Sequence, residues 1–121
     1  MTISGNISSM SFAADQHARV EGDYRVLPGE LEGDTKVWPR GLLLVKSSAA
    51  TKWTPLSALP ATGVWFLGVL DEDVDTTKAG SGMVVRFGGV KLSELKVGVD
   101  AQVAPSADFV HALEAHKIYA V

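Results

Sequence analysis

GVWFLGVL, residues 63–70, is the longest apolar run in the chain and the stretch that decides the fold class. This length suits a buried strand, whereas a helix that spans a membrane needs roughly 20 apolar residues. Valine, tryptophan and phenylalanine also favour the extended backbone of a strand. We therefore predict a buried strand over residues 63–70, with Trp65 in the hydrophobic core.

Shorter apolar runs, bounded by turn residues and about ten residues apart, follow the pattern of an all-β sandwich or barrel. The predicted strands cover residues 42–46, 52–55, 83–87, 90–92 and 117–121. Gly88 and Gly89 predict a bulge or a tight corner, because glycine accepts positive φ without strain. Residues 71–82 are predicted to form a loop.

One short helix is predicted near the C-terminus. Ser106 is placed to accept a hydrogen bond from the first backbone N–H groups of a helix, and Asp108 suits the positive end of the helix dipole. Phe109 and Leu113 then share an apolar face, so the helix should run to about His116 and pack on the strands. The expected fold is mainly β with one short helix, built as a small β-barrel or sandwich.

Residues 1–40 differ in character from the rest of the chain. They are rich in Gly, Ser, Asp and Glu, and their apolar residues follow neither the period of a strand nor that of a helix. Pro28 and Pro39 favour extended geometry in the residues before them. We predict an extended N-terminal arm over residues 1–40 and a β-rich domain over residues 41–121. A chain that lacks residues 2–35 should then still fold.

Composition excludes several classes of function. The 121 residues carry a net charge of −3 and include no cysteine. Nucleic acid is not an expected partner, because phosphate binding needs clustered Lys and Arg. A membrane is not expected either, because no apolar run could span one. The start of the chain lacks the pattern of a secretory signal, so we expect synthesis in the cytoplasm.

No spacing in the sequence is typical of a metal site. The acidic run at residues 71–75 has the alternating carboxylates of a calcium loop, but Thr76 and Gly82 stand where such a loop needs glycine and glutamate. A solvated loop is the favoured interpretation, with calcium as the alternative. His111 and His116 are turned about 140° from each other on a helix, which disfavours a shared metal. We predict no metal and no cofactor.

Catalytic residues are not predicted either. Ser81 lies between glycines, but the first glycine of a Gly-x-Ser-x-Gly nucleophile turn is missing. An enzyme built around Asp71, Asp73 and His111 stays as an alternative that no spacing supports. We therefore expect a non-enzymatic protein.

The order of the apolar runs and glycines points to a family. An N-terminal arm precedes Gly41-Leu42-Leu43-Leu44-Val45, Trp53-Thr54-Pro55-Leu56, Gly68-Val69-Leu70-Asp71-Glu72-Asp73, Gly88-Gly89-Val90 and a final Ile118-Tyr119-Ala120-Val121. Over residues 41–121 this order resembles that of phage lambda-type head decoration proteins. The resemblance implies a β-tulip-like body that forms a homotrimer at three-fold or quasi-three-fold positions on the outer surface of the expanded capsid. It also implies that the N-terminal segment contacts the major capsid protein.

The role implied is structural, namely to stabilise the capsid of the virion against internal DNA pressure. The candidate capsid-binding residues of the arm are Tyr24, Val26, Leu27 and Trp38. The candidate residues of the trimer or capsid interface are Trp53, Phe109 and Tyr119. The alternative function is a ligand- or carbohydrate-binding β domain of a virion appendage or a secreted module, in which Trp38, Trp53 or Trp65 forms a stacking surface.

Overall fold

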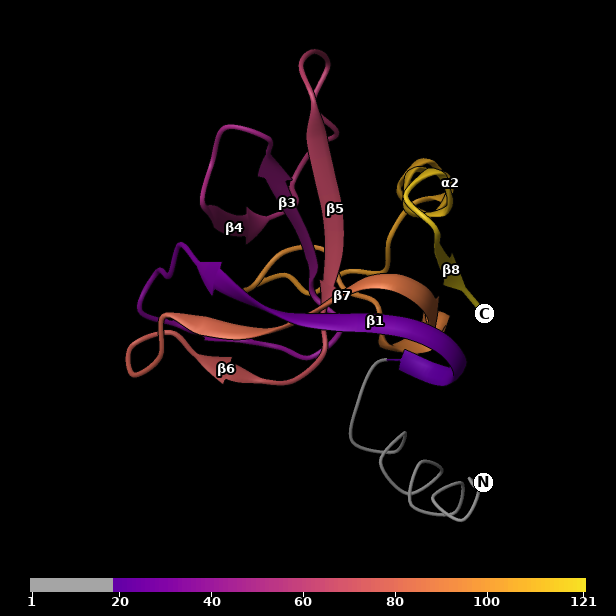
Figure 1. Ribbon diagram of the computed structural model, residues 1–121. Coiled ribbons are helices and arrows are strands. Elements are labelled where there is room, and N and C mark those ends of the chain that lie inside the picture. The colour runs from indigo at the N-terminus through magenta and orange to yellow at the C-terminus, as the bar shows by residue number, and fades with distance from the viewer. Residues whose placement is uncertain (1–18) are drawn as a thin grey trace.

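The structure is a computed structural model that describes residues 19–121, with side chains placed from Tyr24 onward. Five strands of this part form a closed barrel (Figure 1). Hydrogen bonds join them in the order β1 (Arg19–Leu31), β4 (Lys52–Pro55), β3 (Leu43–Ser47), β5 (Trp65–Leu70) and β7 (Ser81–Val90). Pairing between β1 and β7 closes the ring. The prediction of a mainly β fold with one short helix is confirmed.

Smaller elements flank the barrel. β8 (Ile118–Ala120) pairs in parallel with the last residues of β7, and α2 (Ala107–Ala115) precedes it. β2 (Val37–Trp38) and β6 (Val74–Asp75) form a separate two-stranded ribbon. A turn of 3-10 helix, η1 (Leu92–Glu94), follows β7. In Figure 1, α2 and β8 lie on one side of the barrel and β6 lies on the other.

Most of the elements predicted after residue 41 are confirmed. The limits of β3, β4, β5 and β8 lie within two residues of the predicted limits. The helix begins as expected, since the backbone N–H of Phe109 donates a hydrogen bond of 3.4 Å to Ser106 Oγ. The loop predicted over residues 71–82 contains β6.

The two strands predicted around Gly88 are instead one strand, β7. The strand continues through Gly88, whose φ is 114°. Its register against β1 also shifts by one residue at Arg86, which makes a β-bulge. The predicted irregularity is therefore present, but it bends a continuous strand and does not end one.

Residues 19–31 form a strand of the barrel and residues 37–38 a strand of the ribbon, which corrects the prediction that the arm extends to residue 40. β1 pairs with β7 at Arg19 and from Tyr24 to Glu30, and its last two residues pair with β4. Trp38 is 1% exposed and lies in the core. The strand is hard to recognise because Gly29 occupies an inward position and the register shifts twice against β7. Residues 1–18 of the predicted arm lie outside the described residues.

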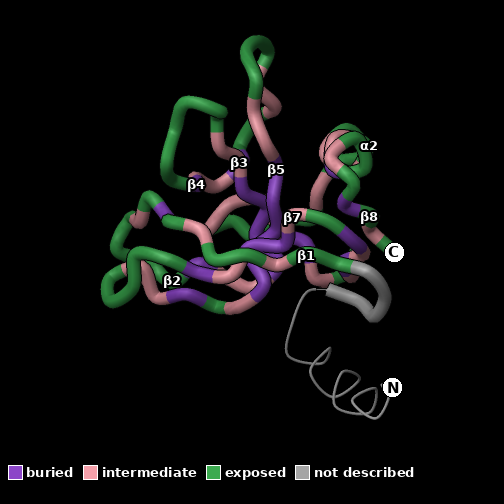
Figure 2. The backbone as a smooth tube through the Cα atoms, viewed as in Figure 1, coloured by how far each residue is buried: buried purple, intermediate pink, exposed green. Residues whose placement is uncertain are grey.

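The strands β3, β5 and β7 are buried on both faces. The inner cluster, to which all five barrel strands contribute, contains Leu31, Trp38, Leu42, Leu44, Trp53, Leu70, Val74 and Val84. The outer cluster contains Leu43, Leu56, Leu67, Val69, Val85, Val90, Leu95, Leu113 and Ile118. Adjacent residues such as Leu43 and Leu44 therefore pack in different clusters, as the period of a strand requires. Figure 2 shows this buried centre, where the strands cross.

Trp53 is buried inside the barrel, between glycines of two other strands. A Cβ atom added to Gly29 would lie 2.7 Å from Trp53 Nε1, and one added to Gly68 would lie 3.2 Å from Trp53 Cη2. Both distances are shorter than ordinary contacts between heavy atoms. The indole ring therefore fills the space between β1 and β5 that larger residues would take.

Replacing Gly68 with alanine is expected to lower the free energy of unfolding by about 1 to 3 kcal/mol, because overpacking a dense core forces neighbours to move. The added Cβ would lie 2.5 Å from Val84 Cγ1. Gly80→Ala is the matched control, since a Cβ at that exposed position meets no atom within 4 Å. Its effect should stay within about 0.5 kcal/mol. Urea unfolding followed by circular dichroism measures both, and equal stabilities would contradict the tight packing around Gly68.

Candidate functional site

Trp53 is buried inside the barrel, which corrects its prediction as an interface residue. Its exposed fraction is 2%. Its neighbours along β4, Lys52 and Thr54, are more exposed and face the other way, as alternation along a strand requires. Partners can therefore reach Trp53 only through the residues that cover its ring.

One end of the barrel, which we call the barrel mouth, consists of Leu27, Lys46, Trp53, Phe66 and Arg86. Lys46 Nζ lies 5.3 Å from the centroid of the Trp53 ring, and Arg86 Cζ lies 5.0 Å from it. Arg86 Cζ also lies 5.8 Å from the Phe66 ring. These distances are those of cation–π contacts, in which the ring face attracts the cation. The aromatic rings thus hold two cationic groups at one end of the barrel.

Leu27 completes the barrel mouth on β1. It pairs in register with Val84 of the inner cluster, and paired residues of neighbouring strands share a face of the sheet. Its side chain is nevertheless 41% exposed. Each of the five barrel strands therefore contributes one residue to the mouth.

The barrel mouth is positively charged, although the whole chain carries a net charge of −3. Among the described residues, the ion pairs join Lys36 to Asp100, Arg40 to Glu94 and Lys78 to Asp75. No described carboxylate pairs with Lys46 or Arg86, and neither group donates a hydrogen bond to another described residue. Arg25 is exposed and pairs in register with Phe87, the neighbour of Arg86 along β7, so it adds a third cation on this side of the barrel.

The barrel mouth is not apparent from the sequence. Alternation along β3 places Lys46 on the same face as Leu44, and a similar argument relates Arg86 to Val84. The pattern could therefore have indicated that each cation faces inward. Only the closure of the barrel brings both to the Trp53 ring, and no local pattern carries that information.

A pocket of about 330 Å³ lies on the outer face of the β3–β4 hairpin. Lys52 and Thr54 line one side, and the segment of residues 60–65 lines the other. Trp65, predicted to lie in the core, is half-buried here, because it packs against the outer cluster and also lines the pocket. Its ring centroid lies 5.1 Å from that of His116, at the end of α2. Burial lowers the pKa of His116 below its ordinary value.

The residues predicted for capsid binding in the arm lie in different environments. Tyr24 and Leu27 are exposed on β1, whereas Val26 packs against the outer cluster. Trp38 is buried, and its Nε1 donates a hydrogen bond of 2.8 Å to Asp34 Oδ1. Trp38 is therefore held inside the barrel and is not available to a partner, which corrects its assignment to the extended arm.

The two remaining predicted interface residues lie near the C-terminus. Phe109 of α2 is half-buried against the outer cluster, so most of its contacts are internal. Tyr119 of β8 is 43% exposed. Tyr119 therefore stays a candidate for contact with a partner.

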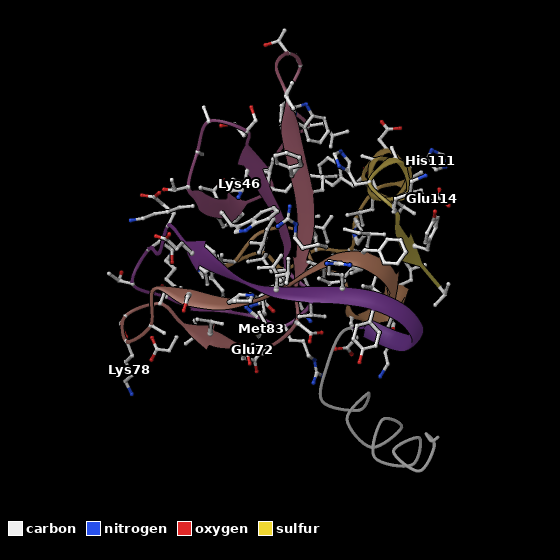
Figure 3. All side chains as sticks on the ribbon, in the orientation of Figure 1. Lys46, Glu72, Lys78, Met83, His111 and Glu114 are labelled. Atoms are coloured by element: carbon white, nitrogen blue, oxygen red, sulfur yellow. The ribbon has the colours of Figure 1, made fainter. Side chains whose placement is uncertain are left out.

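The acidic run at residues 71–75 stabilises the local backbone. Glu72 Oε2 accepts a hydrogen bond of 3.2 Å from the backbone N–H of Met83 (Figure 3). Asp73 Oδ1 accepts one of 2.7 Å from the backbone N–H of Arg40. Among the side chains that the structure describes, from Tyr24 onward, no group of three or more His, Cys, Asp or Glu could hold a metal ion.

The alternative catalytic group of Asp71, Asp73 and His111 is not assembled. Figure 3 places His111 on α2, well away from Glu72, which lies between the two aspartates in sequence. Asp71 is also 1% exposed. These three residues therefore cannot act on one substrate in this structure.

α2 is the α-helix of the described part, and it has nine residues. No described helix is long and apolar enough to cross a membrane.

Comparison with known proteins does not assign a family to the chain, because no protein-family model, no curated protein and no solved structure matches it.

Proposed function

We propose that the protein is a bacteriophage head decoration protein, a non-enzymatic virion protein that binds the outer surface of the expanded capsid as a homotrimer. The order of strands and glycines over residues 41–121 suggests this role. One structural observation carries it further, namely a pair of exposed aromatic residues on neighbouring strands. We call this pair, Phe87 of β7 and Tyr119 of β8, the aromatic patch.

The side chains of Phe87 and Tyr119 are 40% and 43% exposed, respectively. Tyr119 pairs with Gly89, which lies two residues after Phe87 on β7, so the two aromatic residues share one face of the sheet. Tyr24 pairs with Gly88 and therefore points to the opposite face. Exposed aromatic residues that gather in this way mark interaction surfaces, because burying them in an interface removes much apolar area from water. The patch supports the proposed contacts between copies of the chain.

A trimer explains how weak contacts could hold a capsid. If each subunit bound a capsid protein with a Kd of about 1 mM, the binding free energy per contact would be about −4 kcal/mol. Once one subunit is bound, the other two bind intramolecularly, so the trimer binds much more tightly than a single subunit. A protein that binds only the assembled shell stabilises it by mass action. This role requires no catalytic group.

Light scattering tests the trimer. We expect a mass about three times the 12.8 kDa of one chain. The double variant Phe87→Ser/Tyr119→Ser should shift the mass toward that of one chain, because it removes apolar area from the aromatic patch. Val103→Ser is the matched control, since Val103 is 53% exposed and lies outside the patch. A double variant that stays trimeric would exclude the patch as the trimer contact.

Capsid binding is tested by mixing the purified protein with empty expanded phage heads. We expect saturable occupancy at three-fold or quasi-three-fold positions and a higher temperature of head disruption. Cryo-electron microscopy and thermal scanning measure the two effects. Absence of binding to expanded heads, or turnover of a substrate by the protein, would contradict the proposed function.

The pocket beside Trp65 favours a second candidate, a ligand-binding domain. Its volume of about 330 Å³ is within the range of small-molecule sites. A glycan-binding screen with Trp65→Ala as the control would detect this function.

A further inference from the structure

We infer that the barrel mouth (Leu27, Lys46, Trp53, Phe66, Arg86) binds carboxylate side chains of an acidic segment in a partner protein. The inference names the chemistry of the partner for the proposed function. It rests on that function for the identity of the partner as a capsid protein, but the binding chemistry can be tested separately.

Two cations at the barrel mouth are held in place without an anion. Lys46 and Arg86 lie 5.3 and 5.0 Å from the same Trp53 ring. No described carboxylate pairs with either of them. An anion that bound at the mouth would be attracted by both cations, because opposite charges attract most strongly where water is partly excluded. The mouth is therefore complementary to negative charge.

The position of Arg86 favours a carboxylate as the anion. Its guanidinium lies near two rings, Trp53 at 5.0 Å and Phe66 at 5.8 Å, which limit its motion. A guanidinium presents parallel N–H donors that match the two oxygens of a carboxylate. Because the rings already orient the group, less conformational entropy is lost on binding.

The surroundings favour a protein segment over a nucleic acid. Cations lie over the Trp53 and Phe66 rings, so the rings are not open platforms on which bases could stack. Three cations, including Arg25, are also too few for a track that follows a phosphate backbone. Leu27, 41% exposed at the rim, offers an apolar contact of the kind that surrounds charged residues in protein interfaces.

Titration of the full chain with an acetylated hexaglutamate peptide tests the binding chemistry. We expect a saturable change in the NMR signal of the Trp53 indole N–H, and weaker binding at about 0.5 M salt because salt screens the charges. The double variant Lys46→Gln/Arg86→Gln should bind at least tenfold more weakly. Lys78→Gln, which removes a cation whose side chain is 83% exposed on a distant turn, should bind like the native chain. Arg86→Lys, which keeps the charge but loses the fork of donors, provides a second test if the double variant fails to fold, and should weaken binding severalfold.

Three outcomes would overturn the inference. Equal binding of hexaglutamine would show that charge is not recognised. Tighter binding of a six-residue thymidine oligonucleotide would assign the mouth to nucleic acid. Displacement of the peptide by inorganic phosphate at an equal concentration would show that the mouth binds small anions in general and does not recognise an acidic protein segment.

The same variants on expanded heads separate this inference from the proposed function. Loss of head binding by Lys46→Gln/Arg86→Gln, with binding retained by Lys78→Gln, would support both. Equal head binding by the native chain, the double variant and Lys78→Gln would exclude the mouth as the capsid contact but would still support the decoration role. Peptide binding without any head binding by the native chain would reject the decoration role and leave the carboxylate chemistry standing.

Discussion

Replacing Trp53 with alanine is expected to lower the free energy of unfolding by about 3 to 5 kcal/mol, the cost of emptying a large aromatic site in a core. The ring is 2% exposed and fills the barrel between Gly29 and Gly68. Glycines cannot move side chains into the cavity, so the barrel has little means of closing it. The substitution also removes the ring to which Lys46 and Arg86 are held.

Trp65→Ala is the matched control for this prediction. Trp65 is half-buried and already lines a pocket, so its loss should cost only about 1 to 2 kcal/mol. Chemical unfolding at one fixed protein concentration measures both variants, because the stability of an oligomer depends on concentration. If Trp65→Ala were the more destabilising variant, Trp53 would not be the central residue of the barrel.

Deleting residues 2–35 is expected to abolish cooperative unfolding. If these residues formed an arm separate from the barrel, the shortened chain would still fold. The deletion removes β1, which pairs with both β4 and β7 and closes the barrel. It would expose the inner cluster to water and leave the paired edge of β7 without its partner. Circular dichroism during thermal unfolding measures the loss of the transition.

The matched control for this deletion removes residues 2–17 only. This shorter deletion keeps every described strand, so we expect a cooperative transition close to that of the full chain. A folded protein after deletion of residues 2–35 would contradict the role of β1 in the barrel. If the shorter variant folds but does not bind expanded heads, the capsid contact of the predicted arm would be confined to residues 2–17.

Several features could be predicted from the sequence because they depend on neighbouring residues. The run at residues 63–70 predicts β5, since its apolar residues are too few for a membrane span and favour an extended backbone. Ser106 predicts the start of α2 because a hydroxyl satisfies the first free N–H groups of a helix. Gly88 predicts an irregular position in β7 because glycine accepts positive φ.

The position of β1 depends on distant residues, so the sequence does not reveal it. Its inward positions include Gly29, which has no apolar side chain. Only a residue without a Cβ fits there, because the Trp53 ring lies against it. A residue that makes room for a distant ring looks locally like a turn residue. For this reason residues 19–31 resemble an arm in sequence but form the longest strand of the described part.

The sequence by itself determined the mainly β fold, the helix and the positions of β3, β4, β5 and β8, because hydrophobic period and capping act over a few residues. The tertiary structure decided which tryptophan is central and which lines a pocket. It also decided that Lys46 and Arg86 meet at one ring, although they are far apart in the chain. Closure of the barrel determines these positions, because the pairing of distant strands decides which inward side chains become neighbours.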